Sequence, residues 1–214
     1  MAERNEHGAR RGRPPVSDQR RQQQRLDISR HAVRLFAEQG VTATSGHQIA
    51  KAAEVSESTL WRYFRSKESC VEPLLTKTID AFQSVLRSWP PELELPEHLR
   101  AAYAPVDDSS RADLNAVLAI VRMTRQEPVL RAVYLMLQER AESTFADMLA
   151  ERVGRPAHAL EVQVQAAIMN AALRVATDHL AWDTAEGITP EALHRHRERL
   201  ADILRIVTTL PARQ

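Results

Sequence analysis

The chain has 214 residues, of which 43% are hydrophobic and 27% charged, as expected of a folded domain with its own core. Its single cysteine, Cys70, excludes an intrachain disulfide and a metal cluster built on thiolates, and no apolar stretch approaches the roughly 20 residues that a membrane span needs. The net charge of +1 divides unevenly, because residues 1–68 carry 13 Lys/Arg against 8 Asp/Glu and residues 69–214 carry 16 against 20. A basic front of this kind suits a polyanionic partner at that end only.

Residues 1–16 are rich in Arg, Gly and Pro and show no apolar periodicity, which predicts a disordered basic arm. The arm lacks the apolar region of a secretory signal, so we expect a cytoplasmic protein. Its segment RRGRPP resembles the core of an AT-hook, in which Arg11 and Arg13 would enter a narrow A·T minor groove. The alternative is a basic tail that adds only salt-dependent affinity, and the sequence leaves both open.

Three helices are predicted close together after the arm. The first begins near residue 17 and ends at Gly40, because glycine adopts the left-handed C-cap conformation without steric cost. The second covers about residues 46–53 with Ser45 as its cap, and the third follows a tight turn and is capped by Ser56. Two short helices joined by a tight turn and braced by a third make a helix-turn-helix, whose second helix enters the major groove of DNA.

A longer series of helices is predicted for the rest of the chain. The fourth helix is expected from Ser66 to about Ser88, where the prolines of WPPELELPE end it. The others are expected over about residues 109–126, 129–152, 157–183 and 190–209. The predicted fold class is all-α, with a basic arm over 1–16, a helix-turn-helix DNA-binding domain over 17–66 and a larger helical regulatory and dimerisation domain over 67–214.

The span AVRLFAEQGVTATSGHQIAKAAEVSESTLWRYFRSKES resembles the DNA-binding domain of the TetR family of bacterial transcriptional regulators. The positions that keep the family's order and spacing are Phe36, Gly40, Thr44, Ser45, Ile49, Ala50, Val55, Ser56, Leu60, Phe64, Lys67 and Glu68. Three positions depart from the usual residues: Trp61 stands in place of Tyr, Gly46 in place of an apolar residue, and Glu54 in place of a turn glycine.

The resemblance implies a role for each residue around the predicted turn. It implies phosphate contacts for Thr44, Ser45 and Lys67, contacts with phosphate and sugar for Trp61 and Tyr63, and a position facing the groove for Ser56, Glu57, Ser58, Thr59 and Arg62. Arginine can donate two hydrogen bonds to guanine, and a carboxylate can accept one from cytosine. The alternative for Trp61 and Tyr63 is that they pack within a small helical core.

The family usually senses a small molecule in its C-terminal helices and dimerises through the last two long helices. The resemblance therefore implies an unknown small-molecule effector and a homodimer on a palindromic DNA operator. The alternative is that the alanine-rich face of helix 157–183 and the Leu/Ile stripe of helix 190–209 serve only the monomer's own core. Candidate effector-binding residues are Trp89, Met123, Tyr134, Met136, Phe145, Met148, Met169, His179 and Trp182.

Motifs of enzymes are missing from the sequence. It contains no G-x-S-x-G, Gly-rich phosphate loop or H-E-x-x-H, so we expect neither an enzyme nor a cofactor or metal. His194 and His196 are two residues apart and point to different sides of a helix, so they do not form a metal-binding pair. The predicted function is a ligand-responsive regulator, most readily a repressor, with an activator and a ligand-independent architectural DNA-binding protein as alternatives.

Overall fold

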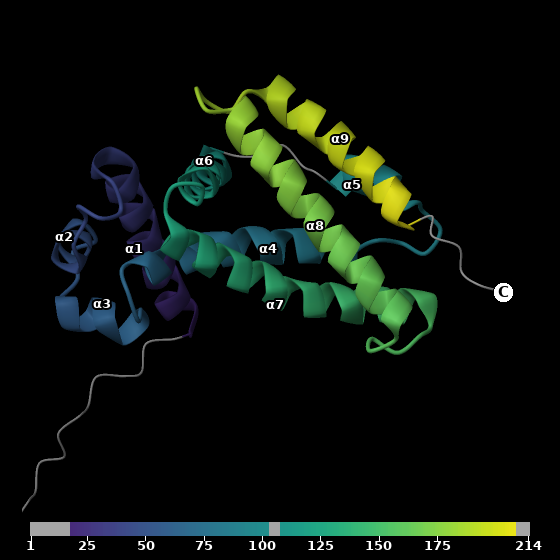
Figure 1. Cartoon of the computed structure of the whole chain (residues 1–214), viewed down its shortest axis with the longest axis horizontal. Coiled ribbons are helices and arrows are strands. Elements are labelled where there is room, and N and C mark those ends of the chain that lie inside the picture. The colour runs from purple at the N-terminus through teal and green to yellow at the C-terminus, as the bar shows by residue number, and fades with distance from the viewer. Residues whose placement is uncertain (1–17, 103–107, 209–214) are drawn as a thin grey trace, which may run out of the picture.

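The computed structural model describes residues 18–102 and 108–208, which contain nine α-helices, one 3-10 helix and no strand (Figure 1). The all-α prediction is therefore confirmed. None of the helices in these two ranges is long and apolar enough to cross a membrane. In chain order the elements are α1 (Asp18–Gln39), α2 (Gly46–Ala52), α3 (Glu57–Tyr63), the 3-10 helix η1 (Glu68–Val71), α4 (Glu72–Arg87), α5 (Leu95–Ala102), α6 (Asp108–Met123), α7 (Pro128–Val153), α8 (Leu160–Asp183) and α9 (Pro190–Thr208).

Two predicted elements differ from the structure. Ser66, the predicted cap of the fourth helix, accepts a hydrogen bond of 3.2 Å from the backbone of Ser69, but the turn that follows it is the 3-10 helix η1 and α4 begins only at Glu72. The helix α5 was not predicted, since it begins inside the proline-rich segment. Pro96 lies in its first turn, where proline is tolerated, and Leu95 and Leu99 are buried there.

The helices of the N-terminal unit, α1 to α3, lie at one end of the molecule, and α4 and α7 run side by side away from them (Figure 1). One hydrophobic core spans this junction, because it contains Phe36 and Leu60 of the N-terminal unit together with Leu118 and Leu130 of the longer helices. A second core lies among α5, α7, α8 and α9. The N-terminal unit is therefore packed onto the regulatory helices rather than tethered to them.

A buried carboxylate reinforces the junction between the two parts. Asp113 on α6 accepts two hydrogen bonds from Arg30 on α1, at 2.7 Å from Nε and 2.9 Å from Nη2, and a third from Nζ of Lys77 on α4 at 2.5 Å. Only 8% of the Asp113 side chain is exposed. The hydrogen bonds from Arg30, with help from Lys77, lower the pKa of Asp113 below its usual value, so the group stays ionised.

Asp113→Asn is expected to lower the free energy of unfolding by about 1–3 kcal/mol at pH 7, because three charge-assisted hydrogen bonds lose their ionised acceptor. The pKa of Asp113 is lower in the folded chain than in the unfolded one. Its stabilising contribution is therefore complete above the unfolded pKa of about 4 and is lost as the pH falls through the folded value. Urea unfolding at pH 7 and at pH 3 should show the gap between wild type and variant closing in acid. A gap that is equal at both pH values would contradict this assignment.

Candidate DNA-binding surface and regulatory cavity

The turns around α2 are fixed by local hydrogen bonds and by two unusual backbone positions. Gly40 ends α1 with a φ of 89°. Ser45 caps α2 and exchanges two hydrogen bonds with Gln48, a capping box that satisfies two backbone donors at the helix start. Glu54, in the turn to α3, has a φ of 53° and is the one non-glycine residue with a positive φ in the described ranges. The family's usual glycine would adopt this conformation at lower cost.

The helix α3 presents a polar face to solvent and an apolar face to the core. Ser56 caps it, since its hydroxyl accepts from the backbone of Thr59 at 3.1 Å and donates to the Thr59 hydroxyl at 2.9 Å. Leu60 within the helix and Phe64 just after it are both buried, as predicted. The residues that remain exposed on the other face are Glu57, Ser58, Trp61 and Arg62.

Trp61 and Gly46, two departures from the family pattern, form one feature in the structure. A Cβ atom added to Gly46 would lie 2.6 Å from Cη2 of Trp61 and closer still to Cζ2. The outer ring of the indole therefore lies against the bare backbone at the start of α2. The larger aromatic side chain at position 61 requires the smallest residue at position 46.

A second contact joins α2 to α3 on the exposed side. Nδ1 of His47 lies 2.8 Å from Oε1 of Glu57, and both side chains are at least half exposed. Glu57 thus already has a partner before any nucleic acid binds. Sequence reasoning missed His47, and its position in the first turn of α2 was the signal that could have indicated it.

Thr44 and Lys67, both predicted to contact phosphate, point inward instead. Thr44 is 1% exposed and its hydroxyl donates to the carbonyl of Gly40 at 2.8 Å. Nζ of Lys67 donates to the carbonyls of Val41 at 2.6 Å and Thr44 at 2.7 Å, and Thr42 lies at 3.3 Å. A charged donor that binds three carbonyls holds the turn between α1 and α2. The sequence could not distinguish this lysine from one that reaches outward.

Tyr63 is held against α1. Its hydroxyl donates to Oε1 of Gln24 at 2.9 Å, and the guanidinium of Arg62 lies 5.2 Å from its ring centroid. The packing alternative therefore describes Tyr63, which is half-buried, better than Trp61, which is 45% exposed. The exposed candidates that α2, α3 and their caps bring together are Ser45, Ser56, Glu57, Ser58, Trp61 and Arg62, and Thr59 beside them is half-buried. Arg11 and Arg13 lie outside the described residues.

A cavity of about 350 Å³ lies among α4, α6, α7, α8 and α9. Two of the predicted effector-binding residues, Tyr134 and Phe145, line it, together with Lys77 and Asp113 from the ionic cluster. The other candidates do not line this cavity. Met169 is buried in the second core, Met123 and Met148 pack against the cores, Trp89 lies under Arg152, Trp182 lies under Arg125, and Met136 is 38% exposed.

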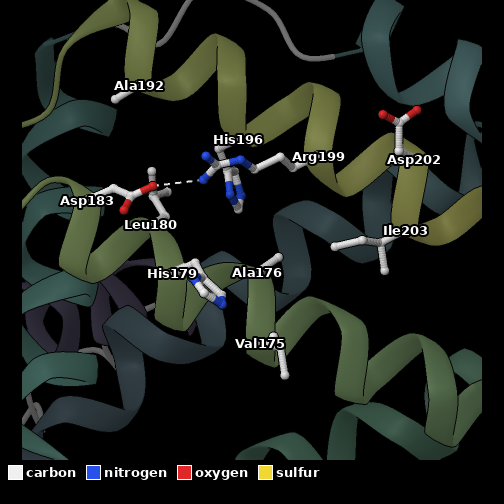
Figure 2. A pocket seen from close by; sticks show the side chains of 10 residues that line it. All are labelled: Val175, Ala176, His179, Leu180, Asp183, Ala192, His196, Arg199, Asp202 and Ile203. Carbon is white, nitrogen blue, oxygen red and sulfur yellow. Dashed lines mark hydrogen bonds and ion pairs between the residues drawn. The ribbon is translucent and has the colours of Figure 1, made fainter.

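The remaining candidate, His179, lies in a different hollow. A groove of about 500 Å³ lies between α8 and α9. Figure 2 shows His179 in its lining and the ion pair of Asp183 with Arg199 beside it. His196 on α9 lines both the groove and the cavity. Burial lowers the pKa of His196 to about 4, so its imidazole is neutral at pH 7.

Lys67→Met is expected to lower the free energy of unfolding by about 1–3 kcal/mol, because three carbonyls of the turn lose a charged donor. Lys51→Met is the matched control, since Lys51 is exposed at the end of α2. Thermal unfolding followed by circular dichroism would measure both. If Lys67→Met were as stable as the control but bound DNA more weakly, Lys67 would contact phosphate as the sequence predicted.

Gly46→Ala is expected to push the Trp61 ring outward and to weaken DNA binding by about 2- to 10-fold, the worth of one hydrogen bond. In a Trp61→Ala background the same substitution should have no further effect, because the atoms that clash are gone. Fluorescence anisotropy of labelled DNA with the four proteins of this cycle would measure the coupling. An equal effect of Gly46→Ala in both backgrounds would show that the two positions are independent.

Comparison with known proteins agrees with this architecture. A profile described as "Bacterial regulatory proteins, tetR family" matches residues 28–74, and a profile described as "MftR C-terminal domain" matches residues 93–205. The chain is 30% identical over 147 residues to the HTH-type transcriptional regulator TcmR of Streptomyces glaucescens, an alignment that covers 66% of this chain and 65% of that relative.

Two further relatives resemble the chain over most of its length. It is 27% identical over 166 residues to the putative mycofactocin biosynthesis transcriptional regulator MftR of Mycobacterium tuberculosis, covering 78% of this chain and 83% of that protein. The solved structure of Salmonella enterica GusR has the same fold, with a TM-score of 0.56 at 21% identity over 91% of this chain and 97% of that one. The chain belongs to the TetR family of bacterial transcriptional regulators.

Proposed function

We propose that this protein is a cytoplasmic, homodimeric repressor that binds a palindromic DNA operator and releases it when a small molecule occupies the cavity. The α3 helix would enter the major groove, with Ser58 and Arg62 toward base edges and Ser45 and Trp61 toward phosphates. Glu57 would reach a base only by leaving His47. Arg11 and Arg13 would add minor-groove contacts, and the proposed domain limits remain 17–66 and 67–214.

The observation that supports a response to a ligand is that Asp113 belongs both to the cavity and to the contact with α1. The carboxylate lines the cavity, and it also holds Arg30 of α1 with two hydrogen bonds. A molecule that alters the position of α6 or Lys77 would therefore alter the support of the DNA-binding helices directly. No such connection is expected of a ligand-independent architectural protein.

The proposed dimer interface is the outer face of α8 with the adjoining groove. Apolar side chains recur there at spacings of four or seven residues and thus form one stripe: Leu160, Val164, Ile168, Val175 and Trp182 are between 39% and 72% exposed. The expected contribution of α9 would come from groups such as Ile203 that line the groove, because Leu200 and Leu204 are buried in the second core of the same chain. Ala166 and Ala176 of α8 are buried there as well, whereas Ala171 is exposed.

Ile168→Glu is expected to convert the dimer to a monomer, because a charge at the centre of the stripe would be buried without a partner. Gln163→Glu, which adds the same charge at an exposed α8 position, is the control. Sedimentation velocity at micromolar concentration would separate the two states. A dimeric Ile168→Glu protein would place the interface elsewhere.

Selection of genomic fragments by the purified protein, followed by sequencing, tests the function as a whole. The proposal predicts an enriched palindrome with half-sites about one helical turn apart, or a multiple of it. Repetition of the selection with residues 1–16 removed would show whether these residues favour operators that are flanked by A·T pairs. Binding that depends only on salt, with no enriched sequence, would contradict a sequence-specific regulator.

A further inference from the structure

Several polar groups that line the cavity are hydrogen-bonded within the protein. Lys77 and Asp113 are paired with each other. The hydroxyls of Thr78 and Thr177 donate to the carbonyls of Leu74 and Leu173, one turn earlier in their own helices. The hydroxyl of Tyr134, by contrast, is buried and makes no complete hydrogen bond.

The hydroxyl of Tyr134 can donate a hydrogen bond but has no acceptor among the residues that the structure describes. The residue is only 5% exposed, and burial raises its pKa to about 12, so the phenol keeps its proton. The side chain of Gln138, one turn along α7, interacts with the hydroxyl without reaching hydrogen-bond geometry. A buried hydroxyl without a partner is less stable than one that is hydrogen-bonded. A ligand with a suitably placed acceptor would provide such a partner.

The rest of the cavity favours an uncharged ligand. Among the described residues that line it, Lys77 and Asp113 are charged, and they belong to a cluster with Arg30 and Asp27 in which two cations meet two carboxylates. Its other walls include Phe82, Phe145 and Leu200. His196, on the α9 wall, is neutral at pH 7 because burial lowers its pKa. A charged ligand would be desolvated here without a free counter-charge, which is costly.

We propose that the cavity binds a neutral, largely apolar molecule of up to about 350 Å³ whose carbonyl or ether oxygen accepts a hydrogen bond from Tyr134. This inference rests on the proposed effector site and specifies the chemical class of its ligand. Lys77 does not bind the ligand as a counter-ion. Its charge remains with Asp113.

Three probes of similar shape test the inference: benzophenone, diphenylmethane, which lacks the carbonyl oxygen, and 4-benzoylbenzoate, which adds a carboxylate. Their affinities for the full chain are measured by displacement of the neutral dye N-phenyl-1-naphthylamine. The ratio of benzophenone affinity to diphenylmethane affinity is expected to fall about 3- to 10-fold in Tyr134→Phe, the worth of one neutral hydrogen bond. This ratio cancels the different hydration of the two probes.

Thr177→Val is the matched control, because the Thr177 hydroxyl lines the cavity but is already bonded to Leu173. Its ratio is expected to equal that of wild type. Thermal unfolding should show Tyr134→Phe to be at least as stable as wild type without ligand, since it removes a polar group that has no partner. A purely structural tyrosine would lose stability and leave the ratio unchanged.

The charged probe decides the ligand class. The carboxylate of 4-benzoylbenzoate is expected to weaken binding at least 10-fold relative to benzophenone, and Lys77→Gln should not weaken it further. Tighter binding of the acid, lost in Lys77→Gln, would overturn the neutral class, and an unchanged ratio in Tyr134→Phe would overturn the acceptor. If the folded protein bound neither dye nor probe, the effector site itself would fail along with this inference, while operator selection would still test the regulator.

Discussion

The carboxylate of Asp113 is the interaction that links the N-terminal unit to the longer helices. It lies on α6, it is almost fully buried, and it takes hydrogen bonds from α1 and α4 at once. A buried carboxylate without such partners would be costly, so the three helices must keep their relative positions while it stays ionised. Because the same residue lines the cavity, changes in the cavity and changes in the N-terminal unit are physically connected.

The DNA-binding unit is stiffened by contacts that face inward. Lys67 binds the carbonyls of the turn before α2, and Tyr63 fixes α3 to Gln24 of α1. These contacts leave few side chains for recognition, and those few extend from the start of α2 and from the exposed face of α3. Trp61 is placed among them by the absence of a side chain at Gly46. Two departures from the family pattern therefore compensate for each other, and they should be considered as a pair.

Helix ends and the recognition motif could be predicted from sequence because their causes are local. Ser45 and Ser56 cap helices, and Gly40 ends one, through bonds and dihedral angles that involve near neighbours. The direction of Lys67 could not be predicted, since it depends on carbonyls more than twenty residues away in the chain. Likewise, only two of the nine predicted effector-binding residues, Tyr134 and Phe145, line the cavity, because helical spacing does not distinguish core from cavity wall.

The central claim is that the state of the cavity reaches the operator through Asp113, and a cycle of two substitutions tests it most directly. Leu173→Trp places a larger side chain in the cavity and so fills part of it, without changing Lys77 or Asp113. Asp113→Asn weakens the hydrogen bonds to Arg30 of α1. Operator affinity should fall about 10-fold for Leu173→Trp in the wild-type background and much less in the Asp113→Asn background. An equal loss in both backgrounds, or no loss in either, would contradict the account.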